Sequence, residues 1–345
     1  MKVAIVCPYD LGRDGGVQDQ AIRLQGWLEH LGHESVLVGP GTEGPEGAIL
    51  LGTVRVVKAN RSATPISFDP RVRGQLKAIF DEVDVAHIHE PLMPSVGIAA
   101  TRVGSVPKVG TFHADPPAWV RRSYKGARVL ARALVSKLDV ATATSSVSLS
   151  AVSPFIEARV VPNGIDADLY GGQPKSPLSV SFLGRDDPRK GLSVLIDAWS
   201  TVVDAVPGAT LTVLGAERES ARDDIRFLGR VSEETKRLEL ARSEIYCAPN
   251  LGGESFGIVV AEAMASGCAP VVSAIPAFAH VTAGAGELVA PGDVAGLADR
   301  IVALLKDDGR RTDVQHRAIQ RSQAFDGKTV AAAYVDAYAA AVEAH

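Results

Sequence analysis

The stretch VSFLGRDDPRKGLSVLIDAWSTVVDAVPGATLTVL, residues 180–214, decides the fold class of this chain. It begins with a short apolar run over residues 180–183 and passes through a polar loop into a segment with helical periodicity over 191–206. It ends in a second apolar run over 210–214. Short apolar strands that alternate with helices are typical of a parallel sheet covered by helices on both faces. We therefore expect an α/β fold.

The same alternation continues on both sides of this stretch. In the first half we expect strands at residues 3–6, 35–38, 83–88 and 108–112, and a helix over 17–31. In the second half we expect strands at 225–228, 245–248 and 269–273, and a helix from 256 to 266. The pattern predicts two doubly wound Rossmann-like domains that face each other across a cleft.

Chain length and linker composition predict where the domains divide. With 345 residues, the chain is longer than one hydrophobic core usually spans. Glycine and proline cluster in residues 171–177, as is typical of a linker. We expect one domain over residues 1–168, a second over 169–327, and an alanine-rich helix over 328–345 that packs back on the first domain.

Composition excludes several classes of protein. The net charge of −4 and the pI near 6.1 give the chain no overall reason to bind nucleic acid. The cysteines Cys7, Cys247 and Cys268 are far apart, as expected for reduced core residues in the cytosol. No signal peptide is visible, and no run approaches the roughly 20 apolar residues of a membrane-spanning helix. Any contact with a membrane is therefore expected to be peripheral.

Gly15 and Gly16 lie between the first expected strand and the first expected helix. Ligands of doubly wound sheets bind at this end of the strands. Glycine lets the backbone approach a phosphate or sugar closely, and a helix N-terminus favours an anion. A tight turn without a ligand would need the same glycines, and the spacing does not match G-x-G-x-x-G. Both interpretations stay open at this point.

Two cations follow the first strand of the second half. Arg185 and Lys190 are placed where they could clamp a pyrophosphate, Arg185 as a bidentate fork and Lys190 as a point charge. Both would stabilise the negative charge on a departing nucleoside diphosphate. The alternative is a solvated surface turn, as charge runs usually are. The position directly after a strand favours the site.

Two glutamates frame the segment ESFGIVVAE, residues 254–262. A helix that begins near Ser255 or Phe256 would place Glu254 at its entrance and Glu262 about two turns inward. Amides of the first turn would then hold phosphate oxygens, while the two carboxylates accept hydrogen bonds from sugar and ribose hydroxyls. Alternatively, Glu254 caps the helix and Glu262 faces water. The neighbours of Glu262 are apolar, however, and a carboxylate there needs a partner.

Three histidines lie at the ends of expected strands. His113 ends one strand and is a candidate for contact with the reacting centre. His87 and His89 alternate on another strand, which fits either metal ligands or a strand end lined by polar partners. We favour the second interpretation because no third metal ligand is evident, and we expect no metal site.

Two basic segments would suit either an anionic membrane or a solvated face. The first, on a predicted helix, contains Arg121, Arg122, Lys125, Arg128 and Arg132. The second contains Arg71, Arg73 and Lys77.

Taken together, these residues resemble family 4 glycosyltransferases of the GT-B fold, and in particular the actinobacterial phosphatidylinositol alpha-mannosyltransferases. The resemblance spans essentially the whole chain. The shared stretches are Cys7-Pro8-Tyr9, Gly15-Gly16-Val17-Gln18, His87-Ile88-His89-Glu90-Pro91, Thr111-Phe112-His113, Pro162-Asn163-Gly164, Asp187-Pro188-Arg189-Lys190-Gly191, Tyr246-Cys247-Ala248-Pro249 and Leu251-Gly252-Gly253-Glu254-Ser255-Phe256-Gly257-Ile258-Val259.

The resemblance implies a retaining transfer of mannose from GDP-mannose to the inositol ring of phosphatidylinositol, the first step of phosphatidylinositol mannoside synthesis. This reaction takes place on the cytoplasmic face of the membrane. The first domain would hold the acceptor and the second the donor. No cofactor would be required, although a divalent cation such as Mg²⁺ would assist.

The resemblance also assigns residues. The donor diphosphate is assigned to Gly16, Arg185, Arg189 and Lys190. The guanosine side is assigned to Val231, Ser232, Glu233 and Lys236, and the ribose to Glu262. The mannose and phosphates are assigned to Glu254, Ser255, Phe256, Gly257 and Ile258. His113 and Glu254 are the catalytic candidates. The acceptor side is assigned to Tyr9, Gln18, Asn60 and Arg61.

The chain departs from the family pattern mainly on the acceptor side. Pro65 stands where the family has an arginine for the lipid phosphate, with Arg61 as a substitute, and Ala114-Asp115 replaces hydroxyl residues after His113. The loop at Arg185 is also one residue shorter. The alternatives are a family 4 enzyme with another donor or a soluble acceptor, a GT-B-like sugar-nucleotide epimerase, and a non-enzymatic module that binds a membrane surface.

Overall fold

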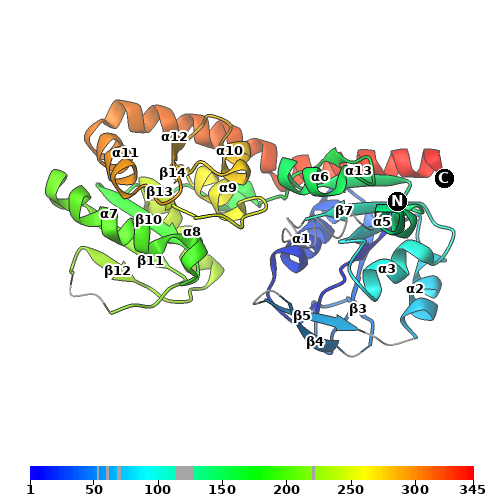
Figure 1. Cartoon of the computed structure of the whole chain (residues 1–345). Helices are drawn as coiled ribbons and strands as arrows, with labels where there is room; N and C mark the ends of the chain where they lie inside the picture. The colour runs from blue at the N-terminus through cyan, green and yellow to red at the C-terminus, as the bar shows by residue number, and fades with distance from the viewer. Residues whose placement is uncertain (53, 60–61, 68–70, 114–127, 220–221) are drawn as a thin grey trace. The chain divides into compact units, whose positions relative to one another are not determined.

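The computed structural model describes residues 1–52, 54–59, 62–67, 71–113, 128–219 and 222–345, with the backbone alone over 54–59 and 62–67. The chain forms two compact units (Figure 1). The first comprises Met1–Gly164 and Gly327–His345, and the second comprises Ile165–Asp326. The division falls at Gly164 rather than at residue 168. The backbone explains this, because the N–H of Ile165 donates to the carbonyl of Phe325 at 2.8 Å, within the second unit.

The first unit is built on a seven-stranded parallel sheet with the order β3-β2-β1-β6-β7-β8-β9. Its strands are β1 (Lys2–Val6), β2 (Glu34–Gly39), β3 (Ile49–Leu50), β6 (Val85–His89), β7 (Lys108–Phe112), β8 (Val140–Ala143) and β9 (Arg159–Val160). A separate antiparallel hairpin joins β4 (Val54–Ala59) and β5 (Ser62–Ser67). The strand order runs outward from β1 in both directions, as expected for a doubly wound sheet.

The alternation along β1 confirms this arrangement. Val3 and Ile5 belong to one hydrophobic core, while Ala4 and Val6 belong to another. Successive side chains of a strand point to opposite faces, so each face of the sheet has its own core. The helices of this unit are α1 (Gly16–His30), α2 (Val72–Phe80), α3 (Val96–Arg102), α5 (Arg128–Val135), α6 (Ser146–Val152) and α13 (Gly327–Ala344).

The C-terminal helix α13 packs on the first unit. Its buried side chains Tyr334, Ala337 and Tyr338 share a core with Leu24 and Leu28 of α1. Alanines along one face of α13 let it lie close to its neighbours, and the two tyrosines fill the remaining space. The chain thus returns to its first unit to complete the core beside β1.

The second unit repeats the plan with a six-stranded parallel sheet of order β12-β11-β10-β13-β14-β15. Its strands are β10 (Ser179–Leu183), β11 (Thr210–Leu214), β12 (Ile225–Phe227), β13 (Ile245–Ala248), β14 (Ala269–Ser273) and β15 (Glu287–Val289). Its helices are α7 (Leu192–Ala205), α8 (Glu233–Arg242), α9 (Ile258–Ala265), α10 (Pro276–Thr282), α11 (Val294–Lys306) and α12 (Asp308–Ser322), with 3₁₀ turns η1 (Ala167–Leu169), η2 (Pro188–Lys190) and η3 (Gln323–Phe325). The expected doubly wound α/β class is confirmed in both units.

The three cysteines are buried and free, as expected for core residues. Burial raises the pKa of the Cys7 thiol to about 12. Over the described ranges, no helix is long and apolar enough to cross a membrane. The same residues contain no group of three or more His, Cys, Asp or Glu side chains placed to hold a metal ion.

Candidate functional site

Two loops of the second unit are locked together at Gly191. The first follows β10 and contains η2, and the second follows β13. Gly191 has φ +70°, and a Cβ on it would lie 1.9 Å from the carbonyl oxygen of Pro249. The N–H of Leu251 also donates to the carbonyl of Arg189 at 2.8 Å. Only glycine fits such an approach, and it holds the two loops in a fixed register.

This register brings together two of the predicted residues. Nζ of Lys190 lies 2.8 Å from Oε2 of Glu254, and both side chains remain partly exposed. Asn250 also contacts Glu254, with Nδ2 at 3.5 Å from the same oxygen. A cation and a carboxylate therefore meet at the carboxyl end of the sheet, where ligands of such folds bind. Lys190 has a close carboxylate partner, so it does not lie in a merely solvated surface turn.

The neighbouring cations are arranged differently. Arg189 forms an ion pair with Asp187 at 2.7 Å, and Asp187 also accepts the Arg189 backbone N–H at 2.9 Å. These bonds from Arg189 hold the pKa of the Asp187 carboxyl well below its usual range. Arg185 is exposed beside this loop. Arg189 is thus partly neutralised by its own loop, whereas Arg185 projects into solvent.

The start of helix α9 differs from the expectation. The helix begins at Ile258 rather than at Ser255 or Phe256, and its N-cap is Gly257 with φ +102°. This left-handed conformation interrupts the helix, and a Cβ at Gly257 would lie 2.9 Å from the ring of Phe278. Glu254 therefore lies in the loop before the helix and does not cap it. Glu262 lies little more than one turn inside the helix, not two.

Glu262 has the partner that its apolar surroundings require. Its side chain is 1% exposed, and Oε1 lies 3.0 Å from Nζ of Lys236 on α8. Lys236 is also 2.7 Å from the exposed carboxylate of Glu233. The alternative in which Glu262 faces water is wrong. The ion pair with Lys236 holds this buried carboxylate in a fixed position.

A helix cap fixes the residue at which α8, the helix that carries Lys236, begins. The hydroxyl of Ser232 accepts the N–H of Thr235 at 3.1 Å, so α8 begins at Glu233. This start places Lys236 on the buried side of the first turn, facing α9. Val231 and Ser232 lie just before the helix. The predicted guanosine-side segment and the predicted ribose carboxylate are therefore joined by one ion pair.

In the first unit, His113 follows β7 and is buried in a polar cluster. Its backbone N–H donates to Oε1 of Glu90 at 2.7 Å. Its ring nitrogens lie 2.7 Å from Nδ1 of His89 and 3.2 Å from Oδ1 of Asn163. Burial lowers the pKa of His113 to about 4, so its ring is neutral near pH 7.

His87 has polar partners of its own. Its Nδ1 lies 2.8 Å from the hydroxyl of Tyr338, and its Nε2 lies 2.6 Å from that of Thr111. Both nitrogens of His87 are thus bonded to protein hydroxyls, as the interpretation of polar partners predicts, whereas Nε2 of His89 has no hydrogen-bond partner among the described residues. Tyr338 comes from α13, so the C-terminal helix supports this cluster from the far end of the chain.

The acceptor-side candidates are only partly within the described residues. Gln18 is buried near Gly15 and donates to the carbonyl of Asp10 at 3.3 Å, and Tyr9 is half-buried after β1. Gly16 is the first residue of α1, and a Cβ there would meet nothing within 4 Å. The remaining positions Asn60, Arg61, Ala114, Asp115, Arg121, Arg122 and Lys125 lie outside the described residues.

Sequence reasoning missed several members of these clusters. Glu90 and Asn163 belong to the stretches shared with the family, but the sequence alone predicts no role for them. Tyr334 and Tyr338 were seen only as part of an alanine-rich helix. Two tyrosines one turn apart on an apolar helix face are a detectable signal, because buried phenols need polar partners.

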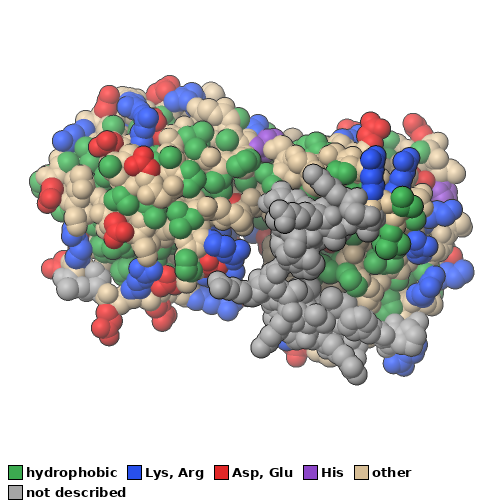
Figure 2. Space-filling view, in the orientation of Figure 1, with side chains coloured by type: hydrophobic (Ala, Val, Ile, Leu, Met, Phe, Trp, Pro, Cys, Tyr) green, Lys and Arg blue, Asp and Glu red, His purple; other side chains and the backbone are tan. Residues whose placement is uncertain are grey.

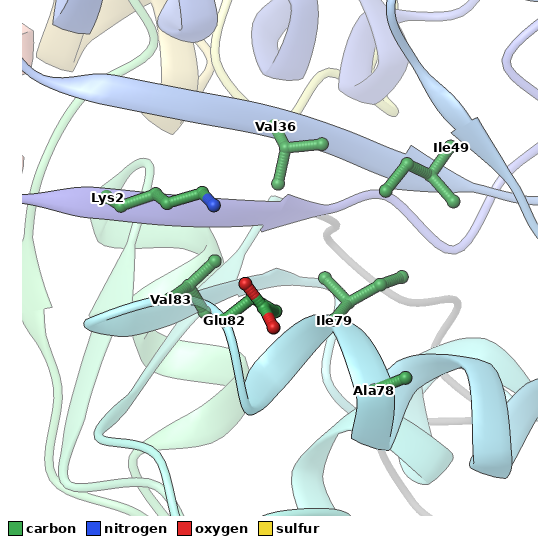
Figure 3. Close-up of a pocket in the computed structure, with 7 residues that line it drawn as sticks. All are labelled: Lys2, Val36, Ile49, Ala78, Ile79, Glu82 and Val83. Atoms are coloured by element: carbon green, nitrogen blue, oxygen red, sulfur yellow. The ribbon is translucent and has the colours of Figure 1, made fainter.

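A further pocket lies away from these clusters. It encloses about 330 Å³ in the first unit, between the sheet and the end of α2 (Figure 3). Its lining is mainly aliphatic, with Val36, Ile79 and Val83 beside the charged side chains Lys2 and Glu82. Lys2 begins β1, so this pocket is not at the carboxyl ends of the strands where the predicted residues lie.

Comparison with known proteins identifies the family. The family described as Glycosyltransferase Family 4 matches residues 14–169, and the one described as Glycosyl transferases group 1 matches residues 177–307. The chain is 34% identical to the phosphatidyl-myo-inositol mannosyltransferase of Mycolicibacterium smegmatis, over 98% of this chain and 93% of the relative. It is 36% identical to the protein of the same name from Propionibacterium freudenreichii, over 79% and 77% of the two chains.

Solved structures agree on the fold. The Anabaena protein HepE in complex with UDP aligns with a TM-score of 0.77 and 20% identity, over 98% of this chain and 100% of that one. Sucrose-phosphate synthase from Thermosynechococcus elongatus aligns with a TM-score of 0.71 and 18% identity, over 98% of each chain. The fold is thus that of the GT-B glycosyltransferases, and the chain belongs to glycosyltransferase family 4.

Proposed function

We propose that this glycosyltransferase moves mannose from GDP-mannose to the inositol ring of phosphatidylinositol, with retention at the anomeric carbon. The observation that carries the proposal is the contact between Lys190 and Glu254, in a chain whose full-length relatives are phosphatidyl-myo-inositol mannosyltransferases. In the proposal, Lys190 binds a donor phosphate and Glu254 binds the donor sugar, and the contact between them supports this assignment. A nucleotide sugar presents those two groups side by side, which supports a donor site here.

The second unit supplies the proposed donor contacts. Arg185 and Lys190 meet the diphosphate, Glu254 accepts hydrogen bonds from mannose hydroxyls, and Glu262 accepts them from the ribose. In this scheme Lys190 exchanges Glu254 for a phosphate oxygen when the donor binds. Glu262 keeps Lys236 as its partner, because that pair is buried and is already formed before the donor binds. No cofactor is required in this scheme, and a divalent cation such as Mg²⁺ would add further charge at the diphosphate.

The proposed reaction breaks the bond between the anomeric carbon and the diphosphate oxygen. Positive charge develops on the sugar and negative charge on the departing GDP, where Arg185 and Lys190 stabilise it. An inositol hydroxyl attacks from the same face and bonds to the anomeric carbon. Its proton passes to the departing phosphate oxygen. In this scheme the ring of His113 stays neutral and gives no proton to the reaction.

The proposed acceptor requires contact with a membrane surface. Helix α2 buries Val72, Leu76 and Phe80 and leaves Arg73 and Lys77 exposed, with Lys77 paired to Asp81 at 2.7 Å. Lys and Arg side chains are visible around this part of the first unit in the space-filling view (Figure 2). An exposed cationic face suits anionic lipids. This observation supports our proposal that the enzyme binds peripherally to the inner face of the cell membrane.

A transfer assay with defined donors and liposomes tests the proposal. The enzyme is incubated with labelled GDP-mannose, UDP-glucose or UDP-galactose, and with liposomes that contain phosphatidylinositol or only phosphatidylglycerol. The expected product is an α-mannosyl phosphatidylinositol, formed from GDP-mannose alone and identified by mass spectrometry and NMR. Preferred use of a UDP-sugar, or equal transfer to a soluble inositol phosphate, would contradict it. Conversion of the donor without any acceptor would indicate an epimerase instead.

A further inference from the structure

The rings of His89 and His113 form a buried hydrogen-bonded pair in the first unit. Nδ1 of His89 lies 2.7 Å from Nε2 of His113, and the two ring centroids are 4.9 Å apart in a stacked arrangement. The rings are 1% and 7% exposed. The other nitrogen of His113 contacts Oδ1 of Asn163 at 3.2 Å. Both nitrogens of His113 are thus engaged by protein atoms.

The direction of these bonds follows from the chemistry of neutral imidazole. Burial lowers the pKa values of both rings below the ordinary histidine value, so each has one N–H and one lone pair near pH 7. Because Oδ1 of Asn163 can only accept, Nδ1 of His113 is its donor. Nε2 of His113 is then an acceptor, and His89 donates to it from Nδ1. The remaining nitrogen of His89, Nε2, is buried and has no hydrogen-bond partner among the described residues.

The backbone around His113 is held by hydrogen bonds as well. His89 ends β6 and pairs in register with Thr111 of β7, two residues before His113. The N–H of His113 donates to Glu90 at 2.7 Å. The backbone of Glu90 has φ +48°, a conformation that residues other than glycine rarely adopt. The unfavourable φ of Glu90 is maintained next to a fully hydrogen-bonded His113. This combination indicates that several contacts together fix the position of His113.

We propose that His89 is a positioning residue for the transfer reaction, because it donates from Nδ1 to Nε2 of His113 and thereby fixes the ring orientation and tautomer of His113. This inference rests on the proposed function, in which His113 is a catalytic candidate whose neutral ring gives no proton. With both nitrogens committed to Asn163 and His89, the ring of His113 has one fixed orientation and exchanges no proton with the substrate. His89 acts through His113 and does not touch the substrate.

His87 provides a matched control. It lies two residues before His89 on β6, on the same side of the strand, and its ring centroid is 4.4 Å from that of His89. It is equally buried, but its hydrogen bonds go to Tyr338 and Thr111. Loss of either histidine removes a buried ring and its bonds. Only the loss of His89 removes the bond to His113.

The experiment compares His89→Asn, His89→Leu and His87→Leu with the parent enzyme. The amide of asparagine places an N–H donor near the position of Nδ1, whereas leucine has none. We expect His89→Leu to lower kcat about 100-fold, as a small displacement of a positioned group does. His89→Asn should restore kcat to within about tenfold of the parent. His87→Leu should lower the melting temperature at least as much as His89→Leu but keep most of kcat.

Histidine ¹⁵N NMR gives a readout that does not depend on activity. The parent enzyme should show His113 protonated on Nδ1 and unchanged between pH 5.5 and 8, and His89→Leu should show a mixture of tautomers. Equal losses of kcat in the two leucine variants, an inactive but folded His89→Asn, or a His113 ring unchanged by His89→Leu would each overturn the inference. A parent enzyme that transfers no mannose would instead contradict the proposed function, and the NMR result would still decide the role of His89.

Discussion

Nζ of Lys190 lies 2.8 Å from Oε2 of Glu254, across two loops that Gly191 holds together. The two side chains are 34% and 22% exposed. Ion pairs with such exposure stabilise proteins by roughly 0–1 kcal/mol. The pair therefore contributes little to folding. Its value lies in where it places a cation and a carboxylate.

Removing either Lys190 or Glu254 should lower activity strongly while changing stability little. We expect Lys190→Ala and Glu254→Ala to lower kcat/KM at least about 100-fold, because each loses a group that stabilises the transition state. The free energy of unfolding should change by less than about 1 kcal/mol. Steady-state transfer assays and urea unfolding measure the two quantities.

A second ion pair in the same unit is the control. Arg222 and Asp224 are 2.7 Å apart and are 38% and 23% exposed, so Arg222→Ala removes a pair of similar distance and exposure that lies outside both loops. It has no assigned contact with the donor and should retain most activity. Near-parental activity of a folded Lys190→Ala protein would remove the basis of the donor assignment.

The buried pair between Lys236 and Glu262 should behave in the opposite way. Its side chains are 11% and 1% exposed, so Lys236→Met leaves a carboxylate buried without its cation. We expect the free energy of unfolding to fall by about 3 kcal/mol. The KM for the donor should rise as well, because Glu262 loses the partner that holds it in place. Urea unfolding and donor titration by calorimetry test both effects.

Glu233→Gln is the matched comparison for this pair. Glu233 also contacts Lys236, at 2.7 Å, but its side chain is 61% exposed. Its loss should change the free energy of unfolding by less than about 1 kcal/mol. If Glu233→Gln and Lys236→Met destabilise the protein equally, burial does not explain the role of Lys236.

The buried histidines predict how stability depends on pH. Burial lowers the pKa of His87 to about 3 and that of His113 to about 4, whereas unfolded histidine titrates near 6.5. Between pH 6.5 and pH 4 the unfolded chain therefore binds protons that the folded chain does not. Stability should fall as the pH drops, by about 1.4 kcal/mol per pH unit for each such histidine. Urea unfolding at pH 7, 6 and 5 measures this slope.

A variant isolates the contribution of one ring. His87→Asn removes one of these titrating groups and should make the slope shallower by about 1.4 kcal/mol per pH unit. Carboxylates also titrate near the lower end of this range, and they are unchanged in the variant. An identical slope in the parent and in His87→Asn would show that His87 is not kept neutral by the fold.

The fold could be predicted from sequence because its signal is local and repeated. Each strand is a short apolar run, and each is followed by a segment with helical periodicity, so alternation alone indicates a parallel sheet. The need of Glu262 for a partner could also be predicted, since a carboxylate among apolar neighbours costs free energy unless it is paired. The partner Lys236 lies on another helix, and only the resemblance to the family singled it out.

Features that depend on contacts between distant segments could not be predicted. Helix α9 begins at Ile258 because Gly257 adopts φ +102° against Phe278, and helical periodicity does not reveal such a conformation. The bond between His87 and Tyr338 joins residues that are 251 positions apart in the chain. Such pairings follow from the completed topology rather than from local sequence.

Gly191 offers the sharpest test of how the two loops build the site. A Cβ at this position would lie 1.9 Å from the carbonyl oxygen of Pro249, and φ is +70°. Gly191→Ala should therefore push the loops apart and separate Lys190 from Glu254. We expect kcat/KM to fall about 100-fold, because a displacement of about 1 Å is enough for that loss. Transfer assays and donor titration measure the effect.

Gly208→Ala separates backbone strain from displacement of the loops. Gly208 also has a positive φ, +91°, but the nearest atom to a Cβ there is Cδ1 of Leu178 at 3.8 Å. Both variants force alanine into an unfavourable conformation, which costs about 1 kcal/mol or more. Only Gly191→Ala adds a clash with backbone beside Lys190. Gly208→Ala should therefore lose stability and keep its activity. Equal activity in the two variants would mean that contact between the loops does not set the distance from Lys190 to Glu254.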